Sequence, residues 1–157
     1  MPTANDALRF ASVRPSRRKG VSRRSVTPSD QNASMAIAGI LIAESLMKNS
    51  PLEGVTLQVR KVSRGDVGDV SAGQPRTWTF IEFAVEDQAQ TDLVEALSRS
   101  LDPIRGWYCD FRTAEETFVV FAGQVFRYSR GDVQGRGEAE AYGRSAGVPE
   151  AQLDWPE

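Results

Sequence analysis

The chain has 157 residues, of which 40% are hydrophobic, 25% charged and 8% aromatic, and these values are typical of one globular domain. It contains no histidine and a single cysteine, Cys109, which excludes catalytic triads, zinc sites and redox centres that require imidazole or paired thiols. The formal net charge of −2 is uneven: residues 1–34 hold seven bases and two acids (+5), and residues 35–157 hold twelve bases and nineteen acids (−7).

Residues 1–34 form a basic leader with one aromatic residue and no apolar periodicity, so we expect them to be disordered. Their composition leaves several roles open: a nucleic-acid-binding tail, an organellar transit peptide, or an export signal in which Arg23 and Arg24 precede the apolar run 35–43. Organised sequence begins close to Met35, and we therefore expect either that Met35 is the true start or that the leader is dispensable.

In chain order, the apolar spacing of residues 35–48 predicts a first helix, capped by Ser34 and ended by the Asn-Ser-Pro sequence at 49–51. Residues 55–62 alternate between apolar and polar side chains, which predicts a half-buried strand that turns Val55, Leu57 and Val59 inward. Residues 63–75 contain three glycines and a proline, and we expect them to form a long loop.

Residues 77–85 are apolar on both faces apart from the threonines and Glu82, which predicts a strand in the centre of a sheet. An amphipathic helix follows. It is expected to begin at Asp87 or Thr91 and to end before Pro103.

The second half of the chain predicts three strands, 107–112, 117–122 and 125–128, joined by short turns as an antiparallel meander, and then a helix over 138–146. The expected fold class is therefore α+β. We expect a two-layer sandwich in which helices cover an antiparallel sheet of about five strands, made of a β-hairpin and the three-stranded meander. Residues 35–157 should form this single domain.

Glu82 is the first candidate functional residue, because it interrupts an otherwise apolar strand. A carboxylate that faces the core needs a partner or a raised pKa. Charged side chains are seldom fully buried, so we expect Glu82 on the solvated side of the sheet, opposite a neighbouring arginine.

A second group of candidates lies on the meander. Tyr108, Asp110 and Arg112 alternate on one side of its first strand, and Arg127 lies on its last strand. Cross-strand ion pairing explains these charges without any function. The functional alternative is a binding patch on the open face of the sheet, formed by these four residues together with Glu82.

Other patterns indicate no metal and no cofactor. Residues 63–75 include Asp66 and Asp69 but lack the spacing of a calcium loop, and their glycines lack the Lys-Ser/Thr pair of a phosphate-binding loop. Cys109 lies in the alternation assigned to the core, which predicts a buried and unreactive thiol.

The lack of a recognisable catalytic set favours a non-catalytic module that binds a protein partner, for example an immunity or inhibitor protein whose acidic surface attracts a basic effector. The alternatives are a small enzyme or ligand-binding protein that uses Glu82, Asp110 and Tyr108 in a cleft on the sheet, and nucleic-acid contact through residues 1–34. No apolar segment reaches the about 18 residues of a membrane-spanning helix, so no membrane partner is expected. The lone cysteine favours a cytoplasmic location.

Overall fold

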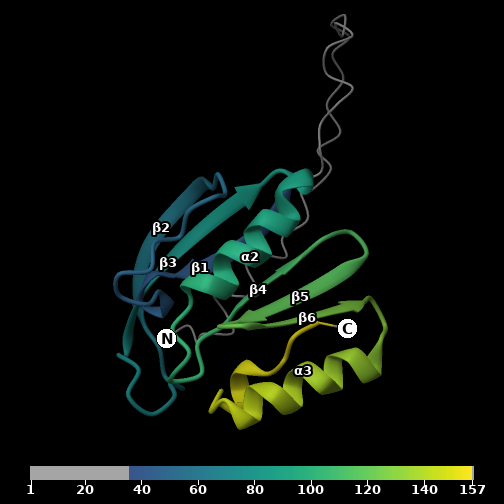
Figure 1. Cartoon of the computed structure of the whole chain (residues 1–157). Helices are drawn as coiled ribbons and strands as arrows, with labels where there is room; N and C mark the ends of the chain where they lie inside the picture. Colours follow the sequence, from purple (N-terminus) through teal and green to yellow (C-terminus); the bar gives the residue numbers. More distant parts are fainter. Residues whose placement is uncertain (1–35, 157) are drawn as a thin grey trace, which may run out of the picture.

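The structure is a computed structural model that describes residues 36–156 (Figure 1). The expectations for the leader, residues 1–34, and for a start at Met35 lie outside the described residues. The strands are β1 (Ile37–Ile42), β2 (Gln58–Asp66), β3 (Thr77–Val85), β4 (Cys109–Arg112), β5 (Glu116–Phe121) and β6 (Gln124–Ser129), and the helices are α2 (Gln90–Ser100) and α3 (Val133–Ser145). Short 3-10 turns lie at Ala43–Ser45, Asp87–Ala89 and Glu150–Gln152.

All six strands belong to one open antiparallel sheet with the order β2-β3-β1-β4-β5-β6. An antiparallel sheet with two helices agrees with the predicted α+β class, but the sheet has six strands rather than about five. The additional strand is β1, which pairs with β3 on one side and β4 on the other. It therefore joins the predicted hairpin to the predicted meander.

The predicted helix over residues 35–48 is wrong, because this segment contains β1 and a single 3-10 turn. Five of the six residues of β1 are buried, and a continuous apolar run covered on both faces suits a central strand as well as a buried helix. Gly39 adapts β1 to its neighbours. A Cβ atom there would lie 2.8 Å from Cζ of Phe83, so the missing side chain makes room for an aromatic ring from β3.

β2 begins and ends later than the strand predicted over residues 55–62. Its register with β3 shifts between Val59 and Lys61, which marks a bulge at Arg60. Val59 was expected to face the core, but it is 55% exposed. The edge position of β2 explains this exposure, since no further strand or helix extends the core beneath it.

The loop expected over residues 63–75 is strand as far as Asp66, and its remainder is held by hydrogen bonds to distant segments. Ser71 Oγ donates to the carbonyl oxygen of Gly147 at 2.6 Å, and Gln74 Nε2 donates to that of Arg105 at 2.6 Å. Both side chains are buried. The segment therefore closes one end of the sheet.

The predicted meander is confirmed in β4, β5 and β6, and the helix predicted before Pro103 is confirmed in α2. The last helix begins at Val133 rather than at residue 138. Asp132 explains the earlier start, because its carboxylate accepts a hydrogen bond from the backbone N–H of Gly135 at 3.0 Å and caps the helix.

The two helices lie against opposite faces of the sheet. Phe118 of β5 belongs to the same buried cluster as Leu97 of α2. Its neighbour Val119, which points to the other face, packs in a cluster with Ala139 of α3 and Trp155 of the C-terminal segment. On the face opposite α2, α3 lies beside β6 (Figure 1). It does not cover the part of that face formed by β3, β1 and β4.

Candidate functional site

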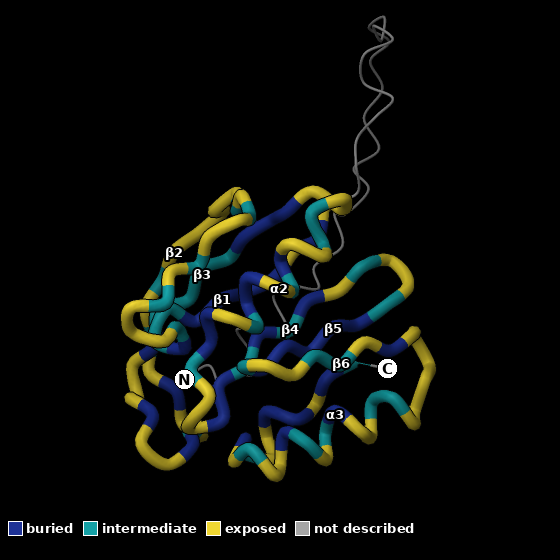
Figure 2. The backbone as a smooth tube through the Cα atoms, in the orientation of Figure 1, coloured by how far each residue is buried: buried dark blue, intermediate teal, exposed yellow. Residues whose placement is uncertain are grey.

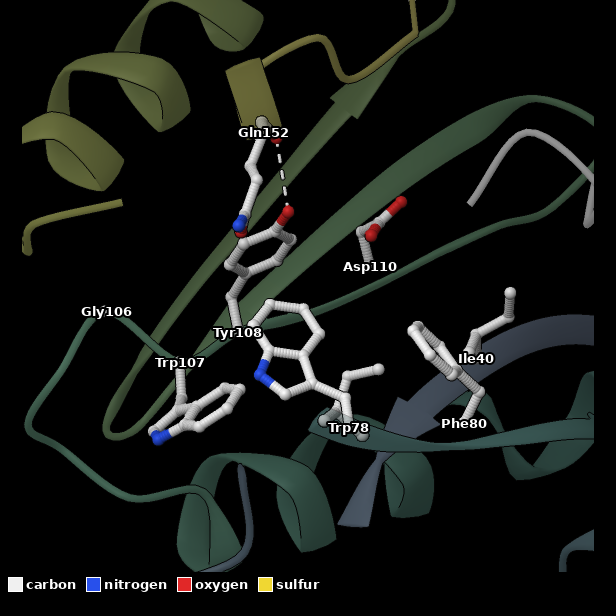
Figure 3. Close-up of a pocket in the computed structure, with 9 residues that line it drawn as sticks. Ile40, Trp78, Phe80, Gly106, Trp107, Tyr108, Asp110 and Gln152 are labelled. Atoms are coloured by element: carbon white, nitrogen blue, oxygen red, sulfur yellow. Dashed lines mark hydrogen bonds between the residues drawn. The ribbon is translucent and has the colours of Figure 1, made fainter. Parts of the chain in front are cut away.

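A hollow opens on the face of the sheet opposite α2, over β3, β1 and β4 (Figure 3). We call it the aromatic hollow, and its walls include Ile40, Trp78, Phe80, Trp107, Tyr108 and Asp110. The space available to the centre of a water molecule is about 20 Å³. One ordered water needs about 10–15 Å³ on this measure, so the hollow admits one small chemical group and not a whole cofactor.

The strand register explains why these side chains meet. Trp78 and Phe80 alternate on β3 and therefore point to the same face. Phe80 pairs with Ile42 of the neighbouring strand, and Ile40 lies two residues before Ile42 on the same face. In β4 the pairing of Ala38 with Arg112 brings Asp110 beside Ile40. The site is thus assembled from three adjacent strands that are far apart in sequence.

The tryptophans are fixed by their own contacts. Trp78 Nε1 donates to the carbonyl oxygen of Pro75 at 2.8 Å, and its ring lies 5.2 Å from that of Trp107 between centroids, at a tilted angle of 54°. Both residues are buried in one cluster with Ile40. The aromatic wall is therefore formed by packing within the fold itself.

Tyr108 and Gln152 close the hollow on the side of the C-terminal segment (Figure 3). The Tyr108 hydroxyl donates to the carbonyl oxygen of Gln152 at 3.1 Å, and Gln152 Nε2 donates to the carbonyl oxygen of Asp69. Burial, and next the charge of Asp110, raise the pKa of Tyr108 well above its usual value. The phenol therefore stays protonated and acts as a hydrogen-bond donor.

Asp110 is the charged group of the hollow. Burial raises the pKa of its carboxyl to about 6, against the opposing effect of the Arg112 charge, which lowers the pKa. Asp110 forms no ion pair with any other residue in the part of the chain that the structure describes. At neutral pH the carboxylate is mostly ionised, so a negative charge without an ion-pair partner lies half-buried beside aromatic rings.

Glu82 lies on the same face of the sheet but does not line the hollow. It pairs in register with Ile40, which separates it from Asp110. Its carboxylate forms an ion pair with Lys61 Nζ at 3.1 Å, and its side chain is 35% exposed. The neighbouring base that was expected is therefore a lysine of β2 rather than an arginine.

Arg127 does not join the other predicted patch residues. It pairs in register with Phe118, which faces α2, and its guanidinium lies 5.5 Å from the centroid of the Phe118 ring. Arg127 also forms an ion pair with Glu116 at 2.6 Å. Of the predicted patch, the structure brings Tyr108 and Asp110 together in the hollow, and exposed Arg112 follows them on the same side of β4.

The walls contributed by Trp78, Phe80 and Ile40 were not recognised as site residues from the sequence. The sequence feature that could have identified them is the aromatic content of residues 77–85 on both faces of the strand. One face packs in the core under α2, so the aromatic residues on the other face need a separate packing partner. Cys109 agrees with its prediction: the thiol is buried, and burial raises its pKa far above the usual range.

Within residues 36–156, no three acidic or cysteine side chains lie close enough together to hold a metal ion. The same part of the chain contains no helix of the length and apolarity that would cross a bilayer. No protein-family model matches the chain, and no curated protein or solved structure matches it either.

Proposed function

We propose that the protein is a non-catalytic binding module that holds a positively charged organic group, an ammonium or a guanidinium, in the aromatic hollow with Asp110 as its counter-ion. The observation that carries this proposal is the carboxylate of Asp110, which lies half-buried against aromatic side chains without an ion pair among the described residues.

The physical reason is the desolvation free energy of the Asp110 carboxylate in the hollow. Burial penalises the ionised form of Asp110, as its raised pKa indicates. An incoming cation offsets the penalty by pairing with the carboxylate. The rings of Trp78, Phe80 and Tyr108 add attraction, because a cation over an aromatic face gains about 0.5–2 kcal/mol depending on its desolvation.

The size of the hollow limits the ligand to a head group, so the rest of the ligand must remain at the surface. Two sources fit this chemistry: a small organic cation, and the tip of a lysine or arginine side chain on a protein partner. The second source agrees with the expected interaction module, since residues 35–157 carry a net charge of −7 and attract basic partners at long range.

A titration of the full chain with tetramethylammonium, and in parallel with tert-butanol as a neutral molecule of similar size, tests the charge requirement. Two of the three tryptophans, Trp78 and Trp107, line the hollow, so tryptophan fluorescence reports binding. We expect saturable binding of the cation only. A lysine-containing peptide and its acetylated form separate the protein-bound source from the small-molecule source.

Asp110→Asn tests the residue itself, and we expect it to weaken cation binding by at least about tenfold. Glu82→Gln is the matched control, because it removes one negative charge from the same face without altering the walls of the hollow. Equal binding of the cation and the neutral molecule, or equal losses in the two variants, would contradict the proposal.

Acid-base catalysis by Asp110 is the second candidate, because a carboxyl with a pKa of about 6 exchanges its proton near neutral pH. The other two residues expected to take part in catalysis, Glu82 and Tyr108, are already engaged in other contacts. Glu82 is paired with Lys61, and the Tyr108 hydroxyl donates to the Gln152 carbonyl. Nucleic-acid contact through residues 1–34 remains a further proposal, tested by salt-dependent binding that disappears when these residues are removed.

A further inference from the structure

Among residues 36–156, β2 forms one edge of the sheet: it pairs with no strand except β3 and is exposed along most of its length (Figure 2). Seven of its nine residues are exposed, and its main packing partner is β3. The opposite edge strand, β6, is different, because α3 packs beside it and Tyr128 in its interior is buried. Within the described residues, α3 therefore packs next to β6, whereas the outer backbone groups of β2 have no strand partner and can accept one.

The free edge carries a chemistry of its own. Arg60, Lys61 and Arg64 give β2 three positive charges against the single negative charge of Asp66, a net charge of +2 in a body that is acidic as a whole. Val59 and Val62 are 55% and 59% exposed. Exposed apolar side chains between cations, on a strand with unpaired backbone groups, form a surface that suits an extended segment of opposite charge.

The two valines lie on the same face of β2. Val59 pairs in register with Phe83, and Val62 pairs with half-buried Ile81, so both point to the side of the sheet on which α2 lies. Lys61 pairs with Glu82 and points to the other side. An added strand that alternates apolar and acidic residues would place its apolar side chains against the valines and its carboxylates against Lys61.

We propose that β2 is a docking edge that binds an extended acidic segment of a partner protein by β-strand addition. The backbone of the segment pairs with the outer N–H and C=O groups of β2, and its carboxylates face Lys61, while the charges of Arg60 and Arg64 add to the long-range attraction. This surface lies on the edge of the sheet rather than in the aromatic hollow, and the proposal does not depend on cation binding there.

A second copy of the chain is a poorer occupant of the same edge. Two β2 strands would each bring a net charge of +2 to the shared ladder, and centring the pair on Val62 would set Arg60 against Arg64. Basic side chains on an edge strand also guard against self-pairing in general. They attract an acidic strand for the same reason that they repel a basic one.

The test uses a seven-residue peptide of alternating glutamate and valine as the probe, with amide NMR of the full chain as the readout. We expect saturable shifts confined to β2 and its neighbour β3, and slower hydrogen exchange at amides of β2. The same peptide with a central proline should fail to bind, because proline cannot continue the ladder. A peptide of alternating lysine and valine should not bind either.

Lys61→Glu should weaken binding of the acidic peptide by about five- to tenfold, since it replaces an attraction between exposed charges by a repulsion at the side chain that faces the carboxylates. Arg130→Glu changes the charge of an exposed arginine in the turn after β6 and serves as the matched control. Equal binding of the proline-interrupted peptide, equal losses in the two variants, or no binding at all would overturn the proposal. Concentration-dependent dimerisation of the chain that protects β2 would overturn it in favour of self-pairing.

Discussion

Replacing Asp110 by asparagine should stabilise the folded protein at neutral pH. The carboxyl has a pKa of about 6 in the fold against an ordinary value of 3.8, so burial penalises its ionised form. A difference of this size corresponds to about 3 kcal/mol. Because the side chain is only partly buried, solvent screening reduces the effect, and we expect Asp110→Asn to gain about 1–2 kcal/mol at pH 7.5.

The effect of Asp110 on stability depends on pH. Between the unfolded and folded pKa values of Asp110, the native state binds more protons than the unfolded state. The free energy of unfolding therefore falls as the pH rises from the unfolded pKa through the folded pKa of about 6. At about pH 4 the carboxyl is neutral in the folded state and about half ionised in the unfolded state, whose pKa is near 3.8, so most of the gain of Asp110→Asn should be lost.

Urea denaturation followed by circular dichroism, at pH 7.5 and at about pH 4, measures this difference. Glu82→Gln is the control, because loss of its exposed pair with Lys61 should cost less than about 1 kcal/mol. If Asp110→Asn destabilised the protein at pH 7.5, or had the same effect at both pH values, the raised pKa and the unpaired charge on which the proposed site depends would be refuted.

Three further outcomes test the packing. Gly39→Val should destabilise the fold by about 1–3 kcal/mol in urea denaturation, because its side chain would collide with the ring of Phe83. Arg127→Ala should change the urea midpoint little, because its pair with Glu116 is exposed, and it should leave tetramethylammonium binding unchanged, since Arg127 faces away from the hollow. Cys109 should react with an aromatic disulfide reagent only as fast as the chain unfolds, because its thiol is buried with a raised pKa; reaction within the native state would contradict its placement.

Several elements were predictable from the sequence because local patterns determine them. The strand over residues 77–85 has the predicted bounds, and the meander follows from short turns between β-branched and aromatic runs. The segment 35–48 was not predictable in this way. An apolar run covered on both sides has no period of its own, and its place as a central strand depends on β3 and β4, which lie far along the chain.

The candidate site divides in the same manner. Alternation alone places Tyr108 and Asp110 on one face of β4 and identifies them as candidates. The aromatic wall from β3 requires the strand order β3-β1-β4, which only the tertiary structure supplies. The position of Arg127 could have been predicted from the sequence. The two short turns of the meander pair Arg127 with an even-numbered residue of β5 and Asp110 with an odd-numbered one, and these two sets point to opposite faces of the sheet.

The most direct test of the proposed binding site is an NMR titration of the Asp110 carboxyl with pH, in the absence and in the presence of saturating tetramethylammonium. The free protein should show a pKa of about 6 for this group. The bound cation should lower that pKa, since an adjacent positive charge favours the ionised form. A pKa near 3.8 in the free protein, or one that the cation leaves unchanged, would contradict the assignment of Asp110 as a counter-ion.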